Sequence, residues 1–196
     1  MPTRRREVTD DAIFRAVERV VRRKGPSFTL GDVGREAKLS APRLVQRFGS
    51  RGRLLETTIQ RWAVHSLGAL EALAQSDRPL ANWIRYTRAQ STAITPNQAF
   101  NSLGWIQIQR TDPSLARQQR RFFEQTEAVF TRIVEAAISR GELAKVDAEA
   151  LAHRLILLTM GNLVWLAMKG KAEWGETVGD LIEAEVAPYR TERARD

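Results

Sequence analysis

A short segment of the chain, residues 41–47, holds side-chain types that can read the edges of DNA bases. Arginine can donate two parallel hydrogen bonds to guanine, and glutamine can pair in the same way with adenine. Small apolar side chains can contact the methyl group of thymine. The residues of these types are Ala41, Arg43, Val45, Gln46 and Arg47. Their chemistry is that of a major-groove reader, provided that the side chains face outward.

The segment presents those side chains only if it is a helix braced from one side. Ser40 is a suitable N-cap, and Pro42 stands in the first turn, where a missing N–H costs nothing. Leu44 and Phe48, four residues apart, would face a core. That leaves the outward positions to Ala41, Pro42, Arg43, Val45, Gln46 and Arg47.

Two helices are predicted before this segment. The first covers residues 10–24, begins after the N-cap Thr9 and ends at a glycine–proline pair. The second covers residues 30–38, where Thr29 and the aspartate three residues later can form a capping box. Residues 38–40 then make a tight turn. Two short helices joined by such a turn, behind a supporting helix, are the helix-turn-helix pattern.

The positive charge of the chain is concentrated around this pattern. The chain has 196 residues and a formal net charge of +8. Residues 1–61 hold 15 basic and seven acidic residues, whereas the remaining residues hold 16 of each. This segregation indicates a polyanion-binding module joined to a neutral body. Phosphate contacts are expected from arginines and from the starts of the short helices, at Arg4, Arg5, Arg6, Thr29, Ser40 and Arg51.

The neutral body is helical in its pattern throughout, which predicts an all-α fold of about nine helices. No stretch alternates with period two for long enough to make a strand. The further helices are expected at residues 51–75, 79–94, 97–109, 113–140, 148–169 and 173–189. Since the chain has no cysteine, disulfides, thiolate nucleophiles and iron–sulfur sites are excluded.

One helix of the body needs partners on several sides. Residues 155–168 form a 14-residue apolar run, shorter than the roughly 20 residues of a membrane span. Because this run is apolar around its circumference, we expect one side to pack on its own domain and the other on a second copy. The homodimer would use residues 148–169 and 173–189, the latter offering Val178, Leu181, Ile182 and Val186. The alternative is a core helix fully buried within one chain.

Large apolar side chains of the body are candidates for the wall of a small-molecule site. A mostly apolar ligand held by a few polar groups would suit such a wall. The candidates are Trp83, Tyr86, Phe100, Trp105, Phe130, Leu158 and Trp165. The alternative is that most of them only fill the core. No metal, cofactor or catalytic activity is expected, because the two histidines lack further metal ligands at binding spacing and phosphate-loop motifs are missing.

Over residues 9–62 the chain resembles the DNA-binding domain of TetR-family transcriptional regulators. The similar motifs are Thr-Leu-Gly-Asp-Val, then Ala-Lys-Leu-Ser at the turn, Leu-Val-Gln-Arg-Phe in the next helix, and Gly-Ser-Arg through Leu-Leu after it. Two positions depart from the family pattern. Lys38 stands where the family usually has glycine, which predicts a strained left-handed residue. Val45 replaces a common tyrosine, which removes a phosphate-binding hydroxyl.

The resemblance implies a DNA-binding domain at residues 1–55 and an effector-binding and dimerisation domain at residues 56–196. It implies a ligand-responsive regulator, expected to be a repressor, that binds palindromic double-stranded operator DNA as a homodimer and is released by a small, largely apolar effector. The N-terminal sequence turns acidic where a signal peptide needs an apolar core, which agrees with a cytoplasmic location. Two alternatives stay open: a non-specific nucleic-acid-binding or architectural protein, and an enzyme or carrier for hydrophobic small molecules.

Overall fold

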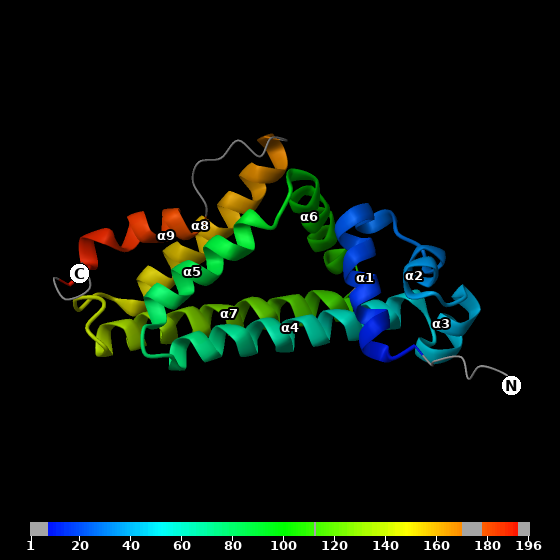
Figure 1. The fold of residues 1–196 in the computed structure, drawn as a ribbon, viewed down its shortest axis with the longest axis horizontal. Helices are drawn as coiled ribbons and strands as arrows, with labels where there is room; N and C mark the ends of the chain where they lie inside the picture. The colour runs from blue at the N-terminus through cyan, green and yellow to red at the C-terminus, as the bar shows by residue number, and fades with distance from the viewer. Residues whose placement is uncertain (1–7, 112, 170–177, 192–196) are drawn as a thin grey trace, which may run out of the picture.

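The structure, a computed structural model, describes residues 8–111, 113–169 and 178–191, apart from the side chains of Pro26, Trp105 and residues 107–111. These residues form nine α-helices, two 3₁₀ turns and no strand, which confirms the predicted all-α fold (Figure 1). The helices are α1 (Asp10–Lys24), α2 (Leu30–Ala37), α3 (Ala41–Phe48), α4 (Arg51–Gln75), α5 (Pro79–Thr92), α6 (Pro96–Thr111), α7 (Pro113–Ser139), α8 (Ala148–Lys169) and α9 (Val178–Val186).

Helices α1, α2 and α3 form a small module at one end of the molecule (Figure 1). The hydroxyl of Thr9 accepts a hydrogen bond from the N–H of Ala12 at 3.3 Å, so the predicted N-cap of α1 is confirmed. Acidic residues fill the first turn of α1 and basic residues its last turn, as the helix dipole favours. The module has its own buried core, which includes Ile13, Val17, Val20, Phe28, Val33 and Leu44.

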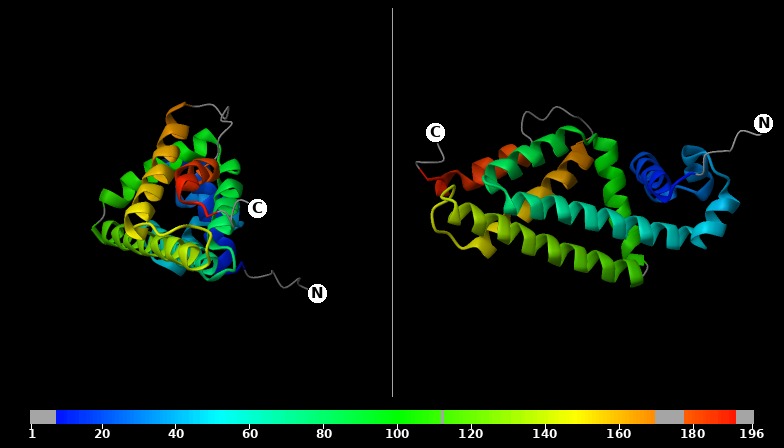
Figure 2. Two further views of the ribbon diagram at one scale, coloured as in Figure 1. Left: turned by 90° about the vertical axis from the view of Figure 1, so that its left-hand side faces the viewer. Right: turned by 60° about the horizontal axis from the view of Figure 1, so that its bottom comes forward.

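Helix α4 connects the module to the body. It is continuous over 25 residues and lies alongside α7, as the right-hand view of Figure 2 shows. Leu54 and Leu55 pack into the core of the module, whereas Leu70 packs into a second core in the body. The boundary expected at residues 55/56 therefore falls inside a single helix that belongs to both cores.

The start of α5 is bound by a carboxylate from the turn that follows α7. Both oxygens of the buried Glu142 are used: one accepts a hydrogen bond from the N–H of Leu80 and the other from that of Ala81, each at 3.0 Å. These are N–H groups of the first helical turn, which have no partner within the helix itself. A negative charge at this end also matches the helix dipole. Glu142 thus caps α5 from more than sixty residues away.

Helix α9 packs inward, which corrects part of the expected dimer surface. Val178, Ile182 and Val186 are buried in the core of the same chain, and only Leu181 is partly exposed. The reason is the close approach of α9 to α5, where a Cβ at Gly179 would lie 2.7 Å from the carbonyl oxygen of Ile84. The predicted stripe is therefore wrong for three of its four members. Residues 173–177, expected to begin this helix, lie outside the described residues.

Helix α6 brings the body into contact with the module. The buried side chain of Asn101 donates a hydrogen bond from Nδ2 to the carbonyl oxygen of Arg22, at 2.8 Å, near the end of α1. Leu115, at the start of α7, is buried in the module's core. The module therefore contacts the body through α6 and α7 as well as through α4.

Candidate nucleic-acid interface

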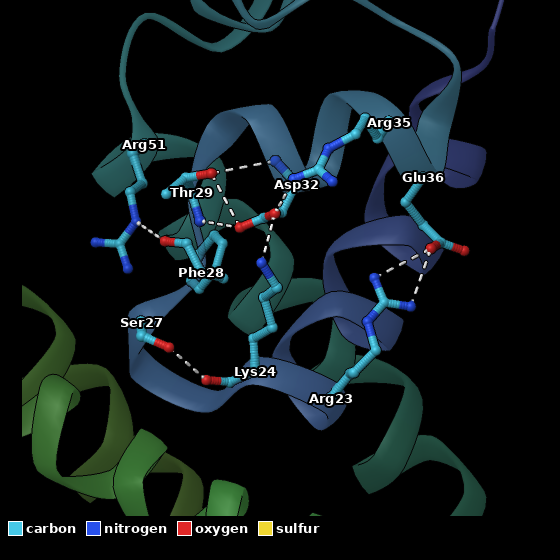
Figure 3. Close-up of polar contacts among 9 residues, drawn as sticks. All are labelled: Arg23, Lys24, Ser27, Phe28, Thr29, Asp32, Arg35, Glu36 and Arg51. Carbon is cyan, nitrogen blue, oxygen red and sulfur yellow. Dashed lines mark hydrogen bonds and ion pairs between the residues drawn. The ribbon is translucent and has the colours of Figure 1, made fainter.

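The start of α2 is fixed by a network of charged and polar groups (Figure 3). Thr29 Oγ1 accepts from the N–H of Asp32 at 3.2 Å, and Asp32 accepts in return from the N–H of Thr29 at 2.9 Å. The predicted capping box is confirmed. Hydrogen bonds from the Lys24 ammonium, at 2.7 Å, and from the N–H of Thr29 hold the pKa of the Asp32 carboxyl far below its ordinary value. The hydroxyl of Thr29, predicted to contact DNA, is engaged in this cap.

The turn between α2 and α3 depends on two residues with unusual backbone demands. Lys38 has φ 56° and ψ 40°, so the left-handed conformation predicted for it is confirmed. It is the one residue other than glycine with positive φ in the described part of the chain. At Gly34 a Cβ would lie 2.4 Å from the carbonyl oxygen of Leu39. Nothing in the local sequence marks Gly34, because the Leu39 carbonyl oxygen comes close to it only once α2 and the turn are folded together.

Replacing Lys38 by glycine is expected to raise the free energy of unfolding by about 1 kcal/mol. A side chain in the left-handed region costs roughly 1–2 kcal/mol, part of which the greater freedom of glycine in the unfolded chain offsets. Urea denaturation followed by circular dichroism measures the change. An unchanged or lower midpoint would show that the turn carries no such strain. The control is Lys145→Gln, which removes one lysine charge at an exposed position of the body.

Helix α3 presents the predicted outer face. Leu44 is 1% exposed, and the ring of Phe48 lies 5.6 Å from that of Phe14, so both residues brace the helix from behind. Ala41 is half-buried. The exposed side chains of the helix are Pro42, Arg43, Val45, Gln46 and Arg47. Ser40 is exposed at the N-cap position, but its side chain makes no capping hydrogen bond, so its predicted capping contact is not formed.

Some of the residues predicted to contact bases or phosphates already have partners within the protein, and others have none. Arg47 donates to the carbonyl oxygen of Val8 at 2.7 Å and forms an ion pair with Asp10 at 2.7 Å, which fastens α3 to the start of α1. The guanidinium of Arg51 lies 4.2 Å from the ring centre of Phe28 and donates to its carbonyl oxygen (Figure 3). Within the described residues, the side chains of Arg43 and Gln46 make no hydrogen bond or ion pair. Arg4, Arg5 and Arg6 lie outside the described residues.

Comparison with known proteins finds its matches among solved structures. A TetR transcription regulator from Haloarcula marismortui is 14% identical, with a TM-score of 0.77 over 93% of this chain and 98% of that chain. SmeT, the repressor of the Stenotrophomonas maltophilia multidrug efflux pump SmeDEF, is 16% identical, with a TM-score of 0.65 over 96% of this chain and 93% of that one. The chain has the TetR-family fold.

Other matches have the same TetR fold, including a complex of SmeT with triclosan that is 17% identical, with a TM-score of 0.70 over 96% of this chain and 94% of that one. No protein-family model and no curated protein sequence matches the chain. The likeness is therefore one of three-dimensional structure. It places α1, α2 and α3 where the regulators have their helix-turn-helix module.

In this TetR fold the predicted ligand-site residues whose side chains the structure describes lie in different surroundings. Trp83 is fully buried and stacks edge-on against Phe130, with ring centres 4.4 Å apart, and Tyr86 is half-buried against the same core. Phe100 is 64% exposed, which removes it from any enclosed wall. The side chain of Trp105 lies outside the described residues.

Leu158 and Trp165 line a different feature, an open hollow of about 720 Å³ between α8 and α9. Its other lining residues are Arg154, Leu157, Gly161, Asn162, Leu181 and Glu185. Most of this lining is apolar, and Arg154 pairs with Glu185 at 2.8 Å on its surface. The hollow lies on the side of α8 expected to meet a second chain.

Among the side chains that the structure describes, two buried polar groups lack a hydrogen-bond partner. The indole Nε1 of Trp83 is buried without a hydrogen bond, and so are both amide atoms of Gln118 on α7. Burying such groups without a partner costs about 1–3 kcal/mol each, so they are suited to meet a ligand or water. Gln118 was not singled out from the sequence, where it is one of many polar residues on a charged helix.

Proposed function

We propose that the chain is a transcriptional regulator that binds double-stranded DNA through α3. The proposal rests on the different environments of the two sides of α3, the recognition helix. Leu44 and Phe48 hold one side against the module, and Arg43 and Gln46 stand exposed without partners on the other. These are the side chains that pair with guanine and adenine in the major groove. The excess of basic residues in the same third of the chain favours the approach of a polyanion.

A homodimer is part of the proposal and rests on α8. By length and composition alone α8 would also suit a membrane-spanning helix, a test that core helices of soluble proteins pass as well. Its outer side exposes apolar residues, with Trp165 45% and Met168 75% exposed. A Cβ at Gly161 would meet no other atom within 4 Å, so a second helix can approach closely there. An isologous contact between two copies would cover this surface. The proposed location is the cytoplasm.

A dimer with a twofold axis would present two copies of α3 to the DNA. Such an arrangement reads a palindrome whose half-sites are about 34–36 Å apart, or a multiple of that distance. Binding in the body of a small, largely apolar effector would favour a conformation with a different spacing of the two helices. The effector acts only through the difference in its affinity for the two states. The buried indole N–H of Trp83 is one group that such an effector could meet, and SmeT with bound triclosan is a precedent among proteins of this fold.

Selection of bound sequences from random duplex DNA with the purified full-length chain tests the proposal. The expected result is a palindromic consensus, bound about 10³-fold or more tightly than unrelated DNA. Arg43→Ala and Gln46→Ala should each weaken binding to the consensus by about 1–3 kcal/mol and relax the preference at one position. Arg120→Ala, at an exposed position of α7, is the matched control and should change nothing.

The alternative of a non-specific nucleic-acid-binding protein predicts a different outcome. All duplexes would bind with similar affinity and a similar dependence on salt, and selection would enrich no consensus. That result would overturn the proposal of a site-specific regulator. Transcription from a promoter that carries the consensus, measured with and without the protein, would distinguish a repressor from an activator.

A further inference from the structure

We infer that Lys38, in the turn before the recognition helix, binds a phosphate group of the DNA backbone. The inference rests on the proposed DNA-binding function. Its first support is the backbone of Lys38, which is left-handed with φ 56° and ψ 40°. Glycine adopts that conformation without strain, and lysine does not. Strain of this kind is found at functional sites, where the side chain has a use that offsets its cost.

The second support is that the Lys38 ammonium has no partner within the described residues, so it is free to bind an anion. Its side chain is exposed and makes no hydrogen bond or ion pair within the described residues. Four of the acidic residues of the module pair with other cations. The pairs are Asp10 with Arg47, Asp11 with Arg61, Asp32 with Lys24 and Arg35, and Glu36 with Arg19 and Arg23. No acidic side chain among the described residues therefore holds the Lys38 ammonium in place.

The third support is the position of Lys38 relative to α3. It lies three residues before Ala41, the first residue of the helix. A helix placed in the major groove, which is about 12 Å wide, leaves the preceding turn at the edge of the groove. That edge is formed by the sugar–phosphate backbone. A lysine there meets phosphates rather than bases, so its contact adds affinity for every sequence and reads none.

The test compares variants of Lys38 in the full-length chain by stability and by binding to a labelled 30-base-pair duplex of mixed sequence. Lys38→Gly removes both the strain and the charge, Lys38→Gln removes the charge alone, and Lys38→Arg keeps both. Lys145→Gln, exposed in the body, is the control for the loss of one positive charge. Binding is measured by fluorescence anisotropy over a range of salt concentrations.

The expected result is that Lys38→Gly unfolds at higher urea concentration yet binds the duplex about fivefold more weakly at ~0.15 M salt. That factor corresponds to one lost phosphate contact, which lowers the salt slope by about 0.9. Lys38→Gln should lose the same affinity without gaining stability, whereas Lys38→Arg and Lys145→Gln should bind like the parent chain. Unchanged binding by Lys38→Gln would overturn the inference, because the charge of Lys38 would then contribute nothing to DNA binding. Failure of the parent chain itself to bind any duplex would instead overturn the proposed function together with the inference.

Discussion

Gly34→Ala is expected to unfold the helix-turn-helix module at much lower denaturant concentration and to abolish specific DNA binding. The added Cβ would lie 2.4 Å from the carbonyl oxygen of Leu39, which belongs to the backbone of the turn. Leu39 also donates its N–H to the carbonyl oxygen of Gly34 at 2.8 Å, so the turn cannot move away without losing this bond. Overpacking against rigid backbone costs about 3 kcal/mol. Urea denaturation and binding to the selected DNA measure the two effects.

Gly31→Ala is the matched control for this substitution. Gly31 is exposed in the same helix, and a Cβ there would meet only Thr29 Oγ1 at 3.5 Å, an ordinary contact. Because alanine favours the helical conformation over glycine, Gly31→Ala should leave stability unchanged or raise it by up to about 1 kcal/mol. Equal stability of the two variants would show that the close approach at Gly34 does not constrain the turn.

Glu142→Ala is expected to lower the free energy of unfolding by about 3 kcal/mol. The substitution removes the charged acceptor from the N–H groups of Leu80 and Ala81 and leaves the buried one, that of Leu80, without a partner. Hydrogen bonds to charged groups contribute about 1.5–3 kcal/mol each, and a buried donor left unpaired costs a similar amount. The shift of the urea midpoint at constant m-value measures the loss.

Glu135→Ala, at an exposed position of α7, supplies the comparison for removal of one carboxylate. Surface substitutions of this kind change stability by less than about 0.5 kcal/mol. A loss at Glu142 no greater than that at Glu135 would mean that water replaces the cap of α5. Hydrogen exchange at Leu80 and Ala81 would locate the effect, since both N–H groups should exchange faster in Glu142→Ala.

The features predicted correctly are those determined by residues near one another in the sequence. The cap of α1 at Thr9, the capping box at Thr29 and the left-handed conformation of Lys38 each depend on four residues or fewer. The spacing of Leu44 and Phe48 was enough to predict which side of α3 faces the core. Local chemistry decides such features before tertiary packing contributes.

The features that were missed depend on contacts between distant segments. The ion pair of Arg47 with Asp10 joins α3 to α1, and the cap by Glu142 joins the turn after α7 to α5. Nothing in the local pattern distinguishes these charges from solvated ones. The stripe on α9 was recognised as apolar, but periodicity does not say whether such a stripe meets its own chain or another. The same limit applies to Phe100, whose aromatic character suggested burial although its position on α6 leaves it exposed.

The length of α4 sets how far a small rotation in the body would displace the DNA-binding helix of the proposed regulator. At about 1.5 Å per residue, its 25 residues make a rigid arm about 37 Å long. A tilt of about 5° at the end near Gln75 would displace the end near Arg51 by about 3 Å, close to the ~3.4 Å between successive base pairs on one strand. A change in the body that tilts α4 by this amount would thus move the module by about one base step.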